Sequence, residues 1–251
     1  MKNPLLRTFV ELRGNPRACV ITEPMWGLGV SLCLPYASVY MLALGLSDIQ
    51  IGIVASVYMA SQTCFSLISG ALVDKLGRRF STAVFDFLAW SLPCLIWAFS
   101  QGFWFFFVAA LFNGLMKVTT VSWDCLLVED APKEKITQIY SLVIVCGNLS
   151  ALLAPISSIL VAKLTLVPAI RILYLNAFFF MTVKLLILWK LSTETQIGIA
   201  RKAETKGMPF LDQLKGYGLV GKKMLKSPGM LFAVVISILV EIVAMINMTF
   251  W

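Results

Sequence analysis

The residues best suited to chemistry in this sequence are charged residues that stand inside long apolar runs. They are Glu23, Asp86, Lys117, Asp124, Lys184 and Glu241. A charge inside a membrane-spanning helix costs at least about 2.5–3.5 kcal/mol on insertion scales, so it usually faces a cavity, a partner or a substrate. The chemistry that such residues offer is ion pairing, proton binding and the binding of a charged solute.

The composition offers little to a catalyst. The chain has no histidine, which is the commonest metal ligand and the usual general base. Its six cysteines lie inside apolar runs without C-x-x-C spacing, so we interpret them as small hydrophobic residues. We therefore expect a protein that is not an enzyme and that has no metal site and no cofactor.

The charged residues are carried by apolar runs that recur along the chain. Hydrophobic residues make up 59% and charged residues only 14% of the 251 residues, whereas a soluble domain is about a quarter charged. The runs span residues 18–45, 49–69, 80–98, 103–128, 139–162, 172–189 and 230–251. Each is long enough for a helix to cross about 30 Å of hydrocarbon. The sequence therefore predicts an all-α polytopic membrane protein.

Basic residues between the runs are distributed unevenly. With the N-terminus on the cytoplasmic side, the outer loops hold only Lys163 and Arg171, and the inner segments hold most of the other basic residues. This asymmetry is typical of the positive-inside rule, and it explains the net charge of +8 without nucleic acid. The aromatic stretch FWFFF at 103–107 marks the outer interface. We expect a multi-pass protein of the cytoplasmic (plasma) membrane with its N-terminus inside.

A long basic segment divides the chain. Residues 1–17 are expected to be cytoplasmic, 18–190 to form a six-helix bundle, 191–228 to be a cytoplasmic linker and 229–251 to be a seventh helix. Within the linker, residues 208–225 mix apolar and basic side chains. This mixture fits either short amphipathic helices at the membrane surface or a solvated loop.

The stretch GALVDKLGRR at residues 70–79 packs charges and glycines between two apolar runs. Gly70 is expected to end the second helix, and Gly77 suits a turn position with positive φ. Asp74 is available to cap the N-terminus of a helix from the other half of the molecule. The guanidinium of Arg78 can bind a carboxylate at another helix end.

This stretch and its place resemble the major facilitator superfamily of secondary transporters. That family carries G-x-L-x-D-R/K-x-G-R/K-R/K between its second and third helices. The matching residues are Gly70, Leu72, Asp74, Lys75, Gly77, Arg78 and Arg79. The resemblance implies two six-helix halves around a midplane site. This sequence holds the first half and one helix of the second, so we expect a truncated chain.

The resemblance also implies a conformational latch at the inner surface. Glu129 and Asp130, at the inner end of the fourth helix, are the nearest acids on the same side. We expect ion pairs between the motif and such acids to hold the halves together when the outside is open, and to break when the inside opens. The alternative is that Lys75, Arg78 and Arg79 only set the topology.

Lys117 and Asp124 share one face of the fourth helix, because they are two turns apart. In the family this helix lines the cavity of the first half. Lys117 therefore suggests an anionic group of the substrate or a carboxylate partner. The alternative is a pair of Lys117 with Asp124 or Glu23 that only neutralises buried charge.

Glu23 and Trp26 share a face of the first helix, which also contains Pro24 and Pro35 and can therefore break. Glu23 is the best single candidate for a proton- or cation-coupling carboxylate. The alternative is that Glu23 only pairs with Arg17 or another inner basic residue.

The remaining candidates carry weaker signals. Glu241 lies close to the midplane of the seventh helix, where we favour a role in the cavity. Gln62 and Asn148 can bind substrate or join helices. Asp86 is expected to bond a neighbouring helix, and Lys184 to extend to the inner interface.

Small residues recur at every fourth place in the second and fifth helices. They are Gly52, Ser56 and Ala60, and Gly147 and Ala151. This spacing lets helices approach closely, and in the family these helices border the opposite half. The alternative is contact within the six-helix bundle.

The sequence is interpreted as a secondary transporter or facilitator that moves a small solute by alternating access, with coupling to protons left open. The alternative is a non-transporting membrane interaction protein or an inactive half-transporter. The expected partners are the lipid bilayer, a small-molecule substrate, protons if transport is coupled, and a second six-helix half from the same full-length chain or another subunit. No nucleic acid is expected.

Overall fold

A computed structural model describes the backbone of residues 4–250, and the side chains of residues 5–216, 218, 226–240 and 243. Its described elements are all helical. The chain divides into two compact units, Met1–Lys206 and Gly207–Trp251.

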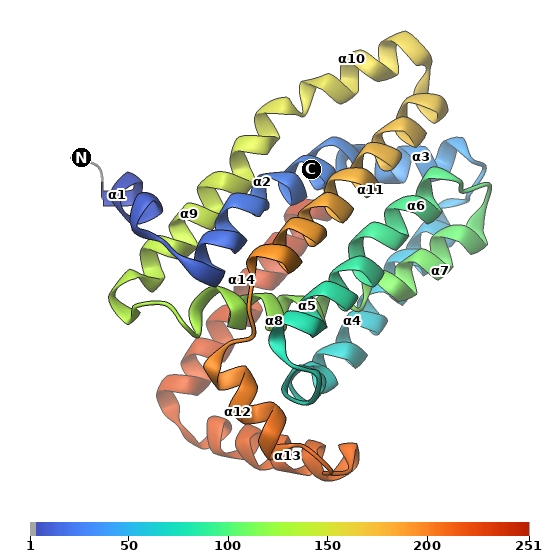
Figure 1. Ribbon diagram of the computed structural model, residues 1–251. Coiled ribbons are helices and arrows are strands. Elements are labelled where there is room, and N and C mark those ends of the chain that lie inside the picture. Colours follow the sequence, from blue (N-terminus) through green and yellow to red (C-terminus); the bar gives the residue numbers. More distant parts are fainter. Residues whose placement is uncertain (1–3, 251) are drawn as a thin grey trace. The chain divides into compact units, whose positions relative to one another are not determined.

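The first unit holds the helices that are long and apolar enough to cross a membrane (Figure 1). These six candidate spans are Gly14–Ala43, Asp48–Leu76, Arg78–Ala98, Phe103–Val128, Lys133–Leu164 and Leu166–Leu191. They coincide with the first six apolar runs of the sequence. The prediction of an all-α polytopic protein is therefore confirmed.

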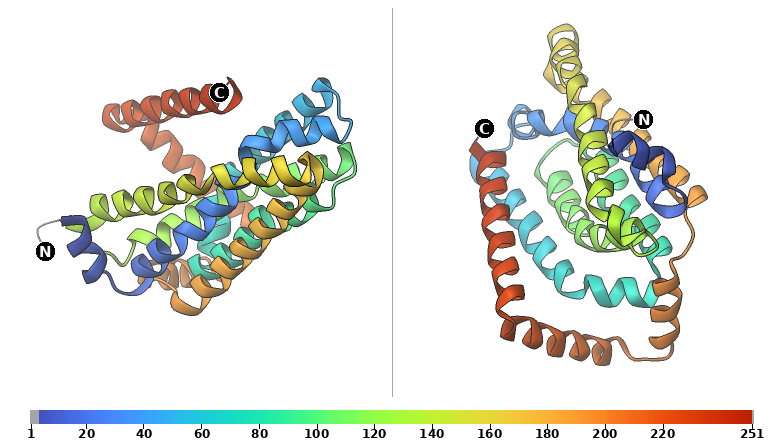
Figure 2. Two further views of the ribbon diagram at one scale, coloured as in Figure 1. Left: turned by 90° about the horizontal axis from the view of Figure 1, so that it is seen from above. Right: turned by 90° about the vertical axis from the view of Figure 1, so that its left-hand side faces the viewer.

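Most of the spans are built from several helical pieces in series. In chain order the elements are α1 (Pro4–Glu11), α2 (Gly14–Cys33), a 3-10 turn (Leu34–Tyr36), α3 (Ala37–Ala43), α4 (Asp48–Leu76), α5 (Arg78–Asp86), a π-helical turn (Phe87–Ser91), α6 (Leu92–Ala98), α7 (Phe103–Asn113), α8 (Met116–Val128), a 3-10 turn (Lys133–Lys135), α9 (Ile136–Leu149), a 3-10 turn (Ser150–Leu153), α10 (Pro155–Leu164), α11 (Leu166–Leu191) and α12 (Gln196–Glu204). The spans run alongside one another as a bundle of tilted helices (Figures 1 and 2).

Interruptions of the spans fall at residues that weaken a helix. Pro35 lies in the 3-10 turn of the first span, Gly114 lies between α7 and α8, and Pro155 is the first residue of α10. Proline removes a backbone donor and glycine has the freest backbone, so both favour such breaks. The first helix breaks only at Pro35, because α2 continues without interruption through Pro24.

The expectation that Gly70 ends the second helix is wrong. α4 continues past Gly70 to Leu76 and ends at Gly77. A glycine inside a helix costs only about 1 kcal/mol relative to alanine, which the apolar residues around it outweigh. The helix stops about two turns later, at Gly77, where the backbone takes a positive φ.

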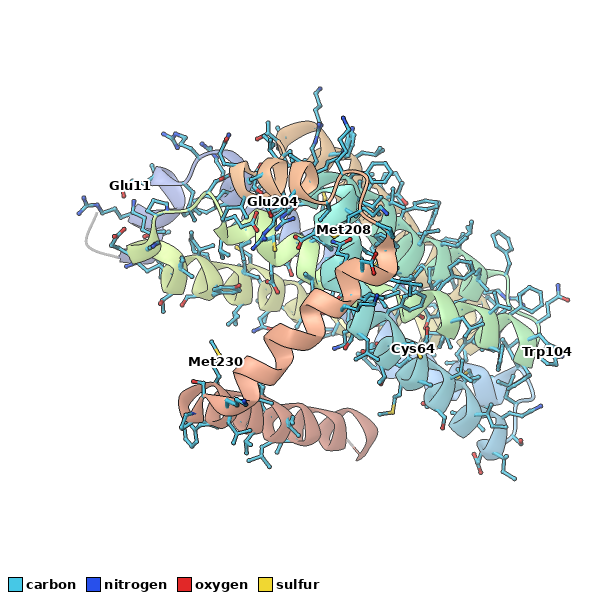
Figure 3. The ribbon with its side chains drawn as sticks, turned by 90° about the horizontal axis from the view of Figure 1, so that it is seen from below. Glu11, Cys64, Trp104, Glu204, Met208 and Met230 are labelled. Carbon is cyan, nitrogen blue, oxygen red and sulfur yellow. The ribbon has the colours of Figure 1, made fainter. Side chains whose placement is uncertain are left out.

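The two ends of the six-helix bundle have different cores. One hydrophobic cluster gathers residues near α3, α6, α7 and the start of α11, among them Tyr40 and Phe106. The other gathers residues near the start of α2, the end of α8 and the end of α11, among them Cys19 and Leu126. We call the first the aromatic end and the second, which carries the α4–α5 turn, the motif end. Figure 3 shows Trp104 at the aromatic end and Glu11 at the other.

Small residues let α2 approach α9 closely. A Cβ atom on Gly27 would lie 2.6 Å from the carbonyl oxygen of Gly147. Gly147 therefore contacts a helix of its own bundle, as the alternative interpretation of the small-residue pattern proposed. Gly52, Ser56 and Ala60 of α4 are instead exposed in the first unit. Contact within the bundle thus does not account for the pattern on α4.

The second unit consists of α13 (Phe210–Lys226) and α14 (Pro228–Phe250). The mixed stretch at 208–225, for which a helix and a loop were both open, is mainly helical. α14 covers most of the seventh apolar run, and its described side chains at 228–240 are apolar enough to form a shorter apolar helix.

Candidate functional site

The α4–α5 turn depends on the backbone of Gly77. This residue has φ 92° and ψ 156°, so the predicted positive φ is confirmed. Its N–H donates to the carbonyl oxygen of Val73 at 2.9 Å and closes α4. A Cβ atom here would lie 2.5 Å from an oxygen of Glu194. Both the conformation and the space therefore require glycine.

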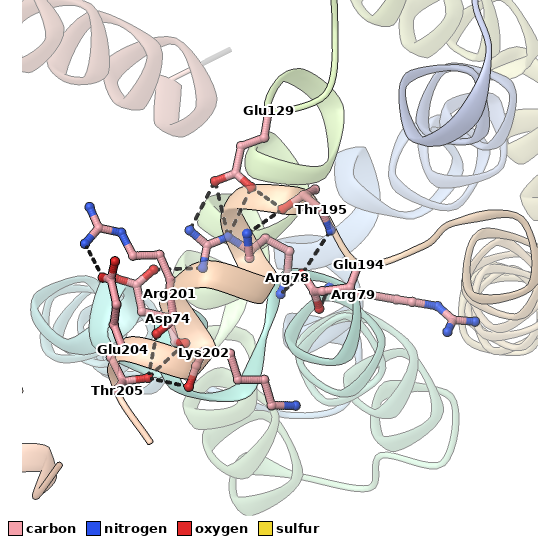
Figure 4. Close-up of polar contacts among 11 residues, drawn as sticks. Asp74, Arg78, Arg79, Glu129, Glu194, Thr195, Arg201, Lys202, Glu204 and Thr205 are labelled. Atoms are coloured by element: carbon pink, nitrogen blue, oxygen red, sulfur yellow. Dashed lines mark hydrogen bonds and ion pairs between the residues drawn. The ribbon is translucent and has the colours of Figure 1, made fainter. Parts of the chain in front are cut away.

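Arg78 joins two helices through two carboxylates (Figure 4). Its Nη1 lies 2.8 Å from Oδ1 of Asp74, and its Nη2 lies 3.1 Å from Oε1 of Glu129. Its Nε also donates to both oxygens of Glu129, at 3.2 Å. Arg78 is only 4% exposed, and each nitrogen of its buried guanidinium donates to a carboxylate at the end of α4 or α8.

These contacts lie inside the first unit. Sequence analysis expected Asp74 to reach a helix of the other half, and that role stays a prediction. The structure shows the Asp74 carboxylate on Arg78, one turn along the chain. It brings Glu129 to Arg78, whereas Oδ1 of Asp130 accepts a long hydrogen bond of 3.4 Å from the backbone N–H of Gln196.

Glu194 is part of this site and was missed by sequence analysis. Its carboxylate accepts the backbone N–H of Arg78 at 2.8 Å and that of Arg79 at 3.2 Å. It therefore caps the N-terminus of α5, where a negative charge is favourable. The sequence offered only a weak signal, since Gly77 has no side chain to cap α5 and leaves its N–H groups open to an acceptor from elsewhere.

Thr195 extends the same network into α12. Its hydroxyl donates to Glu129 in a short hydrogen bond and accepts the N–H of Gly198 at 2.9 Å, which caps α12. At the other end of α12, the hydroxyl of Thr205 donates to the carbonyl oxygen of Asp74 at 3.3 Å. The segment from 192 to 205 thus lies across the motif and is tied to it at both ends.

Arg79 binds the end of α11. Its Nη2 donates to the carbonyl oxygen of Trp189 at 2.6 Å, and its guanidinium carbon lies 4.0 Å from the centroid of the Trp189 ring. A cation is favourable at the C-terminus of a helix and over an indole face. Arg78 and Arg79 therefore make specific contacts with other helices, which would not be needed if they only set the orientation of the protein in the membrane.

Asp86 and Lys184 form a buried ion pair inside the membrane-spanning region. Lys184 Nζ lies 3.0 Å from Oδ2 of Asp86, and both residues are 5% exposed. The hydroxyl of Thr119 also donates to Asp86, at 3.3 Å. The expectation that Lys184 extends to the interface is wrong, because a carboxylate on α5 is within reach of the buried ammonium. Asp86 does bond neighbouring helices as expected.

Glu23 lies on α2 beside α9. It is 9% exposed, and a Cβ atom on Gly147 would lie 3.9 Å from its Oε1. Glu23 is within electrostatic range of Lys184, which already binds Asp86. Among the described residues, no basic side chain lies at ion-pair distance from Glu23.

Lys117 and Asp124 are half-buried on α8. Asp124 accepts a hydrogen bond of 3.4 Å from the hydroxyl of Tyr140. Over the part of the chain whose side chains are described, Lys117 forms an ion pair with neither Asp124 nor Glu23. The ion pair of Lys117 with Asp124 or Glu23, which sequence analysis kept as an alternative, is therefore not formed among the described residues.

The other candidates are spread over several helices. Trp26 packs edge to face on Trp90, with ring centroids 5.4 Å apart. Gln62 is half-buried on α4, and Asn148 is exposed on α9. Glu241 lies on α14, and its side chain is outside the described residues.

Comparison with known proteins identifies the family. The family profile described as Major Facilitator Superfamily matches residues 25–251, which include the motif and most of every candidate span. No curated protein and no solved structure matches the chain. The matched range covers most of the sequence, and the chain belongs to the major facilitator superfamily.

Proposed function

We propose that this protein, a membrane transporter by family, moves a small solute by alternating access. The observation that carries the proposal is the buried network of Arg78 with Asp74 and Glu129 at the motif end. In this family, alternating access is largely the rocking of one rigid half against the other. A network that locks the ends of α4, α5 and α8 gives the first half the rigidity that such rocking needs.

The same network is proposed as the latch predicted from the motif. Asp74, Gly77, Arg78, Arg79 and Glu129 form its centre in the first half. Removing one partner of a buried ion pair typically costs about 3–5 kcal/mol, because it leaves an uncompensated charge. If these contacts break when the inside opens, as the latch proposal requires, their loss shifts the balance between outward-open and inward-open states.

The orientation follows from charge. We propose that the motif end faces the cytoplasm, with the N-terminus inside, because most basic residues outside the spans lie on that side. The membrane would be the cytoplasmic (plasma) membrane. The exposed small-residue face of α4, with Gly52, Ser56 and Ala60, is where we place the second half, from the same full-length chain or another subunit.

We further propose that Lys117 binds an anionic group of the solute. An ammonium at membrane depth without an ion-pair partner among the described residues is a candidate for substrate binding. Glu23 is the proposed site of proton coupling, with Asp124 and Glu241 as further candidates. Its carboxylate is buried beside an ion pair that already satisfies Lys184, so charge on Glu23 is poorly compensated.

Counterflow in proteoliposomes tests transport directly. Labelled small carboxylates and organic phosphates are the probes, and the protein is reconstituted with its second half present. Lys117→Gln should weaken apparent affinity roughly tenfold or more, as expected when a hydrogen bond to a charged group worth about 1.5–3 kcal/mol is lost. Lys117→Arg, which keeps the charge, is the matched control and should retain more of the affinity.

Two results would contradict the proposal. Absence of counterflow for all probes, with folded protein, would favour a non-transporting membrane protein. Counterflow that is equal in Lys117→Gln and the parent would remove Lys117 from the binding site and leave transport itself standing.

A further inference from the structure

The short helix α1 (Pro4–Glu11) precedes the first span and presents three different sides. Successive residues of a helix rotate by about 100°, so residues four apart lie on the same side. One side packs on the protein, one carries an ion-pair chain, and one carries exposed apolar residues. A helix that lies flat at a membrane surface has an apolar side toward the lipid and a charged side toward water. The remaining side of α1 attaches it to the bundle.

The first side fixes α1 to α9. Leu5 and Phe9 pack against the hydrophobic cluster that contains Leu12 and Ile139. The hydroxyl of Thr8, which is buried on this side, donates to the side-chain oxygen of Gln138 at 2.5 Å. The orientation of α1 around its own axis is therefore set by the bundle.

The second side is charged. Glu11 accepts from Arg7 at 2.8 Å and from Lys135 at 2.6 Å. The side chain of Arg7 is 72% exposed, so this side faces solvent. The hydrogen bond from Lys135, followed by that from Arg7, lowers the pKa of Glu11 to about 2. Glu11 is thus ionised near neutral pH, and its ion pairs keep this side of α1 polar.

The third side is apolar and uncovered. Leu6 is 54% exposed and Val10, one turn later, is 55% exposed. Arg13, just beyond α1, is also exposed and donates to the carbonyl oxygens of Val10 and Leu12. The helix that α1 packs on, α9, belongs to a candidate membrane span and carries exposed apolar residues such as Ile144.

The charge around α1 fits an anionic surface. Over residues 5–17 and 133–135, the basic side chains are all exposed or half-exposed, and the acids are Glu11 and Glu134. The basic residues are Arg7, Arg13, Arg17, Lys133 and Lys135. Basic residues beside an amphipathic helix are attracted to anionic lipids by about 1 kcal/mol each near the surface.

We propose that α1 lies in the headgroup layer of the membrane, with Leu6 and Val10 in the boundary of the acyl chains and Arg13 and Arg17 on anionic phospholipid headgroups. The helix would anchor the motif end of the bundle to the membrane surface. This inference does not depend on the transport activity proposed above.

Photo-crosslinking tests the position of the apolar side. The full protein carries p-benzoylphenylalanine in place of Leu6 or Val10 and is placed in nanodiscs of phosphatidylcholine and phosphatidylglycerol. The matched control carries the same group in place of Arg7, on the charged side. Mass spectrometry should find several-fold more lipid adduct from positions 6 and 10 than from position 7. Equal yields, or adducts mainly with protein, would overturn the proposal.

Lipid retention tests the choice of lipid. The ratio of phosphatidylglycerol to phosphatidylcholine that remains with the purified protein is compared between Arg13→Gln/Arg17→Gln and the parent. Each lost charge should lower the affinity for the anionic lipid up to roughly fivefold, the equivalent of about 1 kcal/mol. The control is Arg201→Gln/Lys202→Gln, two exposed basic residues of α12. An unchanged ratio, or an equal fall in the control, would overturn the assignment of anionic lipid to α1.

Discussion

The two ends of the six-helix bundle are held together by different forces. At the motif end, Arg78, Glu129 and Glu194 join helices through ion pairs and backbone capping. At the aromatic end, the rings of Tyr40, Trp97, Phe106 and Tyr174 pack on one another, with neighbouring centroids 4.7–5.9 Å apart.

The polar contacts at the aromatic end include hydrogen bonds of the hydroxyl of the buried Tyr40. The hydroxyl of Tyr40 donates to the carbonyl oxygen of Trp97 at 3.0 Å and accepts from Ser100 at 3.1 Å. Arg171 donates to the carbonyl oxygen of Ser100 at 2.9 Å. The hydroxyl of the buried Tyr40 thereby has both an acceptor and a donor as partners.

The difference shows which end of the bundle depends on charge for its stability. Aromatic packing depends on shape and responds little to salt or to a neighbouring charge. A buried ion-pair network has large opposing terms of desolvation and attraction, so an added or removed charge shifts it strongly. We therefore expect the stability of the motif end to depend on its charges, and that of the aromatic end to be nearly independent of charge.

The largest effect is expected from Arg78→Gln. It leaves Asp74 and Glu129 as neighbouring buried carboxylates, and it should lower the free energy of unfolding by about 3–5 kcal/mol. Reversible unfolding in mixed micelles measures this change. Arg201→Gln is the control, because its ion pair with Glu204 is exposed. A loss for Arg78→Gln below about 1 kcal/mol, the range of an exposed pair, would break the comparison.

Gly77→Ala should have the next largest effect. A non-glycine residue at φ 92° and ψ 156° is strained by about 1–3 kcal/mol, and the new Cβ would also push against Glu194. Gly216→Ala on α13 is the control, since nothing lies within 4 Å of its Cβ position in the described structure. In the same unfolding assay the control should be neutral or slightly stabilising. Equal behaviour of the two variants would show that the turn tolerates a side chain.

Phe106→Leu tests the aromatic end. Phe106 is fully buried and meets Tyr40 and Trp97 edge to face. Loss of such ring contacts should cost about 0.5–1.5 kcal/mol beyond the area lost. Because these ring contacts involve no net charge, the change should be the same at low and high salt. A strong dependence on salt would show that the aromatic end relies on charge after all.

The motif allowed part of the site to be predicted from sequence. Local spacing indicated a positive φ at Gly77 and a carboxylate for Arg78, because both depend on the turn itself. Glu194 could not be assigned in this way, since its bond to Arg78 spans 116 residues of sequence. Such a partner depends on how the last helix of the bundle ends, which local pattern does not specify.

Burial of single residues inside the bundle was also hard to predict. Lys184 was expected at the interface, but it pairs with Asp86, 98 residues away. In the aromatic stretch at 103–107, Trp104 is 70% exposed whereas Phe106 is fully buried. The length of the apolar runs identified the six spans, yet it cannot tell a lipid-facing side from a protein-facing side when both are apolar.

The smallest effect is expected from Glu11→Gln, which separates exposed from buried charge at the motif end. The pKa of Glu11 is about 2, below its ordinary value of 4.5, because Lys135 and Arg7 donate to the carboxylate. A group with a lowered pKa stabilises the folded state fully above its unfolded pKa, and this contribution is lost as the pH falls through the folded value.

The parent should therefore be slightly more stable than Glu11→Gln near neutral pH, and the difference should shrink between about pH 4.5 and pH 2. Unfolding curves of both proteins across this range measure it. Since Glu11 is exposed, solvent and salt screen its ion pairs, and the difference should also fall at high ionic strength. A difference that is large and independent of pH would mean that exposed pairs, and not only the buried Arg78 network, hold the motif end together.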